Sequence, residues 1–222
     1  LTVTDRVFPA ALASLQLIVL PHGGSTPLCS AALAAVSATC SLTLSGGAIY
    51  DLFIIAQAAG PALQGLYSVK VVGGSSGTSS AYAATVPVGT LAQPMQAVVP
   101  VAETVSLQVN DLNYPAALSD LQAVVTQGGE LLQQFAAPGS AALPAAAGTL
   151  QVFVSAHADA AVGEGAYAVF AADAVGKLLD GAVPVVATGH FGYSFAKVLS
   201  ASGSYQLRVT DFQLPKSLAL NA

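Results

Sequence analysis

Charged residues are scarce in this chain. Lysine and arginine number 6 and aspartate and glutamate 11 among 222 residues, so 8% of the chain is charged, against about 25% in an ordinary soluble chain. Hydrophobic residues make up 54%, and the mean hydropathy is +0.68. This charge is too little to cover the surface of a solitary soluble monomer. Three interpretations follow: a membrane protein, a subunit whose surface is buried in an assembly, or a secreted protein with a surface of small residues.

Long apolar runs and tryptophan are also missing. A membrane-spanning helix needs about 20 consecutive apolar residues, and here Gly, Pro, Ser, Thr or a charge interrupts each apolar run. A membrane barrel carries aromatic girdles at both interfaces, but the chain has no Trp, and its 7 Tyr are scattered. We therefore expect no membrane insertion. The basic residues never cluster, and the net charge is −5, which also argues against nucleic acid as a partner, because binding to a phosphate backbone needs a basic patch.

Cysteine is limited to Cys29 and Cys40, eleven positions apart in sequence rich in Ser, Thr and Ala. This spacing favours a disulfide that closes a loop, with free thiols as the alternative. A metal site is disfavoured because no further Cys or His has ligand spacing. A disulfide would place the protein outside the cytosol.

No set of catalytic residues stands out. The segment Gly73–Gly77 formally fits the nucleophile-elbow pattern G-x-S-x-G, but that elbow needs a helix after it, and the residues that follow indicate a hairpin loop. The histidines His22, His157 and His190 are isolated in the sequence and are interpreted as surface-loop residues. We expect no enzymatic activity and no cofactor.

The sequence contains one motif that occurs three times, in Leu1–Pro9, Leu107–Pro115 and Leu207–Pro215. In each copy, apolar and polar residues alternate up to an aspartate, and a proline follows four residues later. The aspartates Asp5, Asp111 and Asp211 are 106 and 100 positions apart (111 − 5 and 211 − 111). This period is the size of one small domain, so we predict a tandem array of two repeats.

Further segments match at the same period, which supports duplication. Gly65–Val69 matches Gly165–Val169, and Tyr50–Ile55 matches Leu150–Ser155. The predicted boundaries are 1–111 for the first repeat and 112–222 for the second. Within them, residues 1–8 resemble the last strand of a preceding repeat, and residues 215–222 resemble the start of a following one.

Runs of β-branched and apolar residues bounded by turn residues predict strands throughout. The Ala-rich segments Cys29–Val36 and Ala136–Ala147 are predicted to be loops, with short helix as the alternative. The aromatic residues of the strands, Phe53 and Tyr82 among them, are expected mostly in the core. With six or seven strands per repeat, the predicted fold is all-β, with two tandem Ig-like antiparallel β-sandwiches. The predicted strands are Leu15–Leu20, Ser41–Leu44, Tyr50–Ala56, Leu66–Val72, Ala81–Val88, Met95–Val101, Leu121–Thr126, Thr149–Ser155, Ala166–Ala171, Val183–Ala187, Tyr193–Leu199 and Ser204–Asp211.

The segment Met95–Asp111 is nearly continuous strand material, so the junction between the repeats is predicted to be short and stiff. The end segments allow two interpretations. Either the chain is cut from a longer array, or its end strands complete neighbouring subunits by strand addition. Under the second interpretation, the residues that make the assembly contact are Leu1, Val3, Leu207 and Val209.

The aspartates Asp5, Asp111 and Asp211 are the most specific polar feature. One interpretation is a calcium ligand at each junction, but calcium takes six to eight oxygen ligands, and each junction offers little beyond the aspartate. The favoured interpretation is an aspartate that caps the turn before the proline through backbone N–H groups. We therefore expect no metal.

The chain resembles the tandem Ig-like β-sandwich repeats of bacterial secreted and surface proteins, through the Leu-x-Val-x-Asp-x-x-x-Pro register and the Gly-x-Tyr-x-Val strands. The resemblance implies a spacer, adhesion or filament-forming role, and it transfers no site residue. We expect a non-enzymatic structural protein, extracellular or at the cell surface. It would be a repeat subunit of a filament, stalk or coat that self-associates through apolar surfaces. The alternative is an adhesion or carbohydrate-binding module of a larger secreted protein, with a glycan or surface protein as partner.

Overall fold

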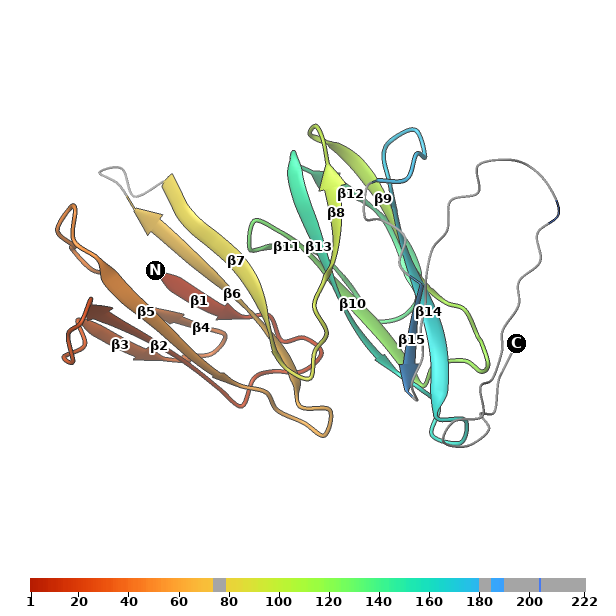
Figure 1. The fold of residues 1–222 in the computed structure, drawn as a ribbon, viewed down its shortest axis with the longest axis horizontal. Coiled ribbons are helices and arrows are strands. Elements are labelled where there is room, and N and C mark those ends of the chain that lie inside the picture. Colours follow the sequence, from red (N-terminus) through yellow and green to blue (C-terminus); the bar gives the residue numbers. More distant parts are fainter. Residues whose placement is uncertain (74–78, 180–184, 190–203, 205–222) are drawn as a thin grey trace.

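The computed structural model describes residues 1–73, 79–179, 185–189 and 204. These residues contain fifteen strands and no helix. Every strand pair is antiparallel, and the strands form four sheets that follow one another as layers across the molecule (Figure 1). The predicted all-β fold is confirmed for these residues. None of their segments is a helix long and apolar enough to cross a membrane.

Residues 1–89, called here the first half, build two of the sheets. Sheet A has the order β4-β1-β6-β7, and sheet B has the order β3-β2-β5. The strands are β1 (Thr2–Asp5), β2 (Ser14–Pro21), β3 (Cys29–Ala32), β4 (Ser37–Thr39), β5 (Tyr50–Gln57), β6 (Gln64–Gly73) and β7 (Ser79–Gly89).

Residues 95–189, called the second half, build the other two. Sheet C has the order β11-β10-β13-β8, and sheet D has the order β12-β9-β14-β15. The strands are β8 (Met95–Val99), β9 (Glu103–Asp111), β10 (Asp120–Gln127), β11 (Glu130–Phe135), β12 (Gly139–Ala145), β13 (Gly148–His157), β14 (Glu164–Ala172) and β15 (Val185–Gly189).

An apolar core lies inside each half, as in a β-sandwich. Alternation produces it: in β9, Val105, Leu107 and Val109 are fully buried, and the residues between them point outward. They join the second core with residues such as Leu150. The first core is separate and contains Val3 and Leu17. Two cores over four sheets give a sandwich-like architecture.

The two halves repeat one pattern of strand pairing. Asp5 of β1 lies opposite Tyr67 of β6, and Asp111 of β9 lies opposite Tyr167 of β14. On the other sheets, Ile18 lies opposite Phe53, and Val124 lies opposite Phe153. Equal registers allow positions in the two halves to be compared one by one.

The boundary between the two halves lies between β7 and β8, because strands before it pair only with one another and so do strands after it. From the sequence, this boundary was predicted after Asp111. Strand β9 pairs with β12 and β14, and β8 pairs with β13, so both strands of the segment 95–111 belong to the second half. They lie in different sheets. The residues that connect the halves are therefore 90–94. Likewise, β1 pairs with β4 and β6 of its own half, although residues 1–8 were expected to resemble the end of a preceding repeat.

The loop predictions for the Ala-rich segments Cys29–Val36 and Ala136–Ala147 were wrong in part. Cys29–Ala32 and Gly139–Ala145 are strands β3 and β12, neither loop nor helix. Pro144 is accommodated because β12 is an edge strand of sheet D, where one side of the ladder has no partner strand in the sheet. Conversely, the predicted strand Ser41–Leu44 is irregular. The predicted strand Tyr193–Leu199 and all but Ser204 of the predicted strand Ser204–Asp211 lie outside the described residues.

Candidate interaction surfaces

The repeated aspartates hold the loop that follows their strand. In the first half, Asp5 Oδ1 accepts a hydrogen bond from Val7 N at 2.8 Å, and Oδ2 accepts one from Leu12 N at 2.9 Å. Asp111 does the same with Asn113 N and Leu118 N, both at 2.8 Å. Both carboxylate oxygens are thus used by backbone groups, as in a capped loop.

The two loops share further details. Val7 and Asn113 both have φ of 51°, and the bonds Phe8–Pro9 and Tyr114–Pro115 are both cis. A Cβ on Gly65 would overlap Leu12 Cδ2, and one on Gly165 would overlap Leu118 Cδ2. The glycine of the Gly-x-Tyr-x-Val strand therefore leaves the space into which the leucine at the end of the loop packs. This steric requirement explains why the aspartate motif and the Gly-x-Tyr-x-Val strand occur together in both halves.

No cluster of three metal-ligating side chains occurs among the described residues. Of the three candidate calcium ligands, Asp5 and Asp111 make the backbone contacts above, and Asp211 lies outside the described residues. Of the predicted assembly residues, Val3 is buried in the core of its own half, and Leu1 packs against that core. Leu207 and Val209 lie outside the described residues.

The capped loop of the first half contacts the second half. Phe8 is fully buried there together with Leu66 of β6, both from the first half. They pack against Val124 of β10 and Phe153 of β13, which are also fully buried. These contacts join the outer face of sheet A to the outer face of sheet C. We call this contact the internal joint.

A small ionic cluster borders the internal joint. Lys70 Nζ of β6 donates to Glu130 Oε1 at 2.6 Å, and Arg6 Nη2 lies 3.9 Å from Glu130 Oε2. Arg6 also donates to the carbonyl of Gly129. The hydrogen bond from Lys70 lowers the pKa of Glu130 below its ordinary value; partial burial opposes this, and the charges of Lys70 and Arg6 reinforce it. Burial lowers the pKa of Arg6, and the charge of Glu130 opposes that shift.

Gly129 lets the hairpin between β10 and β11 approach β7 closely. Its φ is +79°, and a Cβ there would lie 3.2 Å from both Ala83 Cβ and Ala84 N. A side chain at this position would meet backbone and not the movable end of a side chain. The second glycine of the Gly128-Gly129 pair therefore has a packing role at the internal joint.

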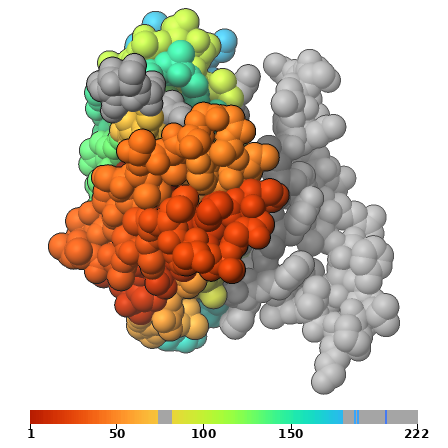
Figure 2. All heavy atoms as spheres, turned by 90° about the vertical axis from the view of Figure 1, so that its left-hand side faces the viewer, coloured from red at the N-terminus to blue at the C-terminus, as the bar shows by residue number. Residues whose placement is uncertain are grey.

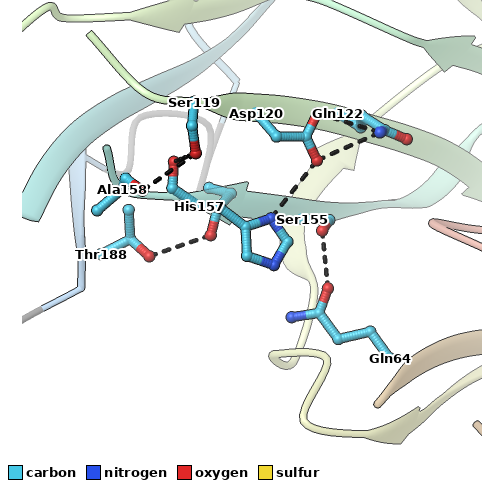
Figure 3. A network of polar contacts seen from close by, with 9 residues as sticks. Gln64, Ser119, Asp120, Gln122, Ser155, His157, Ala158 and Thr188 are labelled. Carbon is cyan, nitrogen blue, oxygen red and sulfur yellow. Dashed lines mark hydrogen bonds and ion pairs between the residues drawn. The ribbon is translucent and has the colours of Figure 1, made fainter. Parts of the chain in front are cut away.

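A polar cluster lies beside the apolar part of the joint (Figure 3). His157 Nδ1 lies 3.4 Å from Asp120 Oδ2, and Ser155 Oγ donates to Gln64 Oε1 of the first half at 2.7 Å. A nucleophilic serine donates its hydrogen bond to a base, whereas the buried hydroxyl of Ser155 donates to Gln64. This hydrogen bond ties the two halves together.

The other predicted polar features have structural surroundings. His22 Nδ1 lies 3.0 Å from Asp51 Oδ1 on an exposed part of the first half, so it is paired, although the sequence suggested an isolated residue. His190 lies outside the described residues, as does Gly74–Gly77 of the G-x-S-x-G match.

Cys29 and Cys40 form a disulfide, the pairing that their spacing favoured. Cys29 opens β3 of sheet B, and Cys40 follows β4 of sheet A, so the bond ties the two sheets of the first half together along one edge. The closed loop spans eleven positions and contains both strands.

The outer face of sheet B exposes apolar side chains, with the polar residues Gln16 and Asp51 beside them. Phe53 is 49% exposed and Ile55 is 55% exposed, and Ile18 lies beside Phe53 on the neighbouring strand. The first half, including β2, β3 and β5, forms the red and orange surface nearest the viewer in Figure 2. The prediction that Phe53 is a core residue was wrong, because it points away from the core that Tyr50 and Ile54 line.

Sheet B also has one strand fewer than sheet C. Strand β8 covers the edge of β13, with Met95 opposite Val152. Among the described residues, no strand covers the corresponding edge of β5. Consequently Leu52 is exposed, whereas Val152, at the matching position, is buried.

A hollow of about 340 Å³ opens near this edge. Its lining includes Leu42, Tyr50, Leu52, Val71 and Tyr82. Tyr82 is 54% exposed, so the expectation of a core position for it was also wrong.

The exposed apolar residues on the outer face of sheet B were not predicted from the sequence, although the sequence of β5 contains one indication of them. The segment Tyr50–Gln57 is apolar on both faces, since Leu52 and Ile54 alternate with Phe53 and Ile55. In an antiparallel sheet, one face usually carries polar residues. A strand that is apolar on both faces therefore indicates that something covers its outer face.

These features define the class: an all-β protein of sandwich-like sheet pairs, joined through apolar sheet faces. Comparisons with protein-family models, curated proteins and solved structures found no match to this chain.

Proposed function

We propose that this chain is a non-enzymatic, extracellular structural protein made of two tandem Ig-like β-sandwich repeats, and that it self-associates into a filament, stalk or coat. The observation that carries the proposal is the pair of matching sheet faces. The outer face of sheet C is buried in the internal joint, whereas the same face of sheet B exposes Phe53 and Ile55. Soluble monomers rarely expose a large contiguous apolar patch, and such a patch is typical of an interface.

The internal joint supports a stiff rod. It combines buried apolar contacts with the Lys70–Glu130 ion pair and the Ser155–Gln64 hydrogen bond. Contacts of this kind oppose relative motion of two repeats more than a bare linker does. Rigid repeats suit a spacer or a filament.

The extracellular location is supported by the disulfide, because such bonds persist in oxidising compartments. The low charge content supports assembly, because contacts between copies would cover apolar surface that charge does not protect from water. The purified 222-residue chain should form elongated particles in negative-stain electron microscopy, and its mass in light scattering should rise with concentration. A monodisperse monomer at high concentration would contradict the proposal.

A second candidate function is carbohydrate binding within an adhesion module. The exposed Tyr82 beside the hollow favours it, because aromatic side chains offer flat apolar faces to sugars. A glycan array probed with the wild-type chain and with Tyr82→Ala tests this candidate. Signals that disappear in the variant would support it, and an array without signals would remove it.

A further inference from the structure

The contacts of the internal joint suggest how two copies of the chain could bind each other, an inference that rests on the proposed function and specifies its interface. In the joint, the capped loop and sheet A form the inserting surface, and the outer face of sheet C forms the receiving surface. The equal registers show that, on the receiving surface, Phe53 of sheet B matches Phe153 and Ile18 matches Val124. Phe153 and Val124 are fully buried in the internal joint, while Phe53 is half exposed. Sheet B thus presents the same receiving surface with nothing from the described residues docked on it.

The second half carries the matching inserting surface. Tyr114 stands in the capped loop where Phe8 stands in the first half, directly before the cis proline. Leu112 corresponds to Arg6, one residue after the capping aspartate. Phe8 is buried in the internal joint, but Tyr114 is 46% exposed and Leu112 is 41% exposed.

The differences between the two sets of surfaces are complementary. The internal joint contains Arg6 and Lys70 on one side and Glu130 on the other. On the inserting surface, Leu112 stands in place of Arg6 and Phe170 in place of Lys70. On the free receiving surface, the connection between β2 and β3, residues 22–28, contains no acidic residue where the β10–β11 hairpin carries Glu130. Arg6, Lys70 and Glu130 thus have no charged counterparts at these positions. The carboxylate that the receiving surface does carry, Asp51 opposite Leu20, is paired with His22 at 3.0 Å, so docking would not bury an unpaired charge.

The receiving surface of sheet B is also more apolar than that of sheet C at two matching positions. Leu20 stands in place of the buried Thr126, and Ile55 in place of Ser155. A contact between the Leu112–Tyr114 surface and the outer face of sheet B would be more apolar than the internal joint. This character suits an interface that holds separate molecules together.

We propose that the Leu112–Tyr114 surface of one copy docks on the Ile18–Phe53–Ile55 surface of a second copy, in the arrangement of the internal joint. The occupant of the exposed face of sheet B is thus another copy of this chain. The two surfaces differ, so the contact is heterologous. Each added copy leaves one free surface of each kind, and the assembly grows head to tail.

The experiment uses the full chain with one blocked surface per variant. Phe53→Glu blocks the receiving surface, and Tyr114→Lys blocks the inserting surface. Both residues are about half exposed, so the variants should fold, and circular dichroism would check this. Ile55→Glu and Leu112→Lys are the second variants for each surface. Val175→Glu is the matched control, because Val175 is 88% exposed and lies on neither surface.

In analytical ultracentrifugation, wild type and Val175→Glu should form concentration-dependent oligomers, and each blocked variant alone should remain a monomer. An equimolar mixture of Phe53→Glu and Tyr114→Lys should stop at dimers, because each dimer uses the intact surface of each variant. Wild-type assembly that persists in both blocked variants would overturn this interface and leave the proposed function standing. Dimers of Tyr114→Lys alone would indicate a symmetric sheet B contact and also overturn it. A wild type that stays monomeric would overturn both proposals.

Discussion

Ile18 lies opposite Phe53 in the first half in the register that Val124 and Phe153 share in the second, yet only the second pair is sealed from solvent. The difference lies in the surroundings, because the first half itself covers Val124 and Phe153. Each unit of a repeat protein contacts its neighbours, and here no described residue covers the face of the first half that matches the covered face of the second. This relationship makes the capped loop, the internal joint and the exposed face parts of one repeating design.

Removal of the Asp5 carboxylate should destabilise the chain. Asp5→Ala leaves the N–H groups of Val7 and Leu12 without their acceptor, and the Leu12 bond is buried. An unsatisfied buried group costs about 1–3 kcal/mol. The free energy of unfolding from urea titration should fall by about this amount. Asp111→Ala should cost less, because Asp111 is less buried.

The control for this series is Asp51→Ala, whose exposed pair with His22 should contribute little. Calcium and EDTA should leave the Tm of the wild type equal, because backbone groups already use both oxygens of Asp5 and Asp111. A Tm that rises with calcium and loses that rise in Asp5→Ala would instead support the calcium interpretation.

Much of the strand pattern could be predicted from the sequence, because alternation such as that of β9 is local. Strands β2, β5, β6, β10, β13 and β14 lie at or near their predicted ranges. The strands β3 and β12 could not be predicted in this way, since alanine has low strand propensity and only pairing with a neighbouring strand fixes its conformation. The loops after Asp5 and Asp111 followed from turn chemistry.

The exposed face of sheet B and the buried face of sheet C could not be distinguished from the sequence, because the difference depends on which parts of the chain pack together. Phe53 and Phe153 occupy equal places in the repeat, so residue type alone assigned both to a core. Their difference arises from the first half, which packs on one and not on the other. The boundary after Asp111 failed for a related reason: β8 and β9 are adjacent in sequence but belong to opposite sheets.

The ion pair at the internal joint should titrate in acid. The pKa of Glu130 lies below its ordinary value of 4.5, so the unfolded chain binds the proton more readily than the folded one. The resulting stabilisation is present above the unfolded pKa and is lost as the pH falls through the folded pKa. In Lys70→Met, NMR titration of the Glu130 carboxyl should show a pKa closer to 4.5. Lys177→Met, in the loop after β14, should leave this pKa unchanged. A Glu130 pKa that does not move in Lys70→Met would show that the pair does not persist in solution.

Reduction of the disulfide should lower stability without any substitution. The chain has two cysteines, and they form one bond, so a reductant removes a single cross-link. Loss of a loop of this size costs about 3 kcal/mol in the chain-entropy account. The midpoint of chemical unfolding should therefore shift to lower urea in dithiothreitol. The double variant Cys29→Ser/Cys40→Ser should unfold at the midpoint of the reduced wild type and should not respond to the reductant. Equal midpoints for oxidised and reduced wild type would contradict a stabilising role.

Replacement of Thr126 by valine should stabilise the internal joint. Thr126 is fully buried on the outer face of sheet C, and its hydroxyl has no hydrogen-bond partner among the described residues. Valine keeps the shape and removes the buried polar atom, whose desolvation costs about 1–3 kcal/mol. The free energy of unfolding should rise by about 1 kcal/mol, with Thr188→Val as a control, because its hydroxyl donates to the Ala156 carbonyl and its loss should not stabilise the chain. The matching position of the first half already carries Leu20. An unchanged or lower stability of Thr126→Val would indicate that the hydroxyl is hydrated, and that water reaches the internal joint at this point.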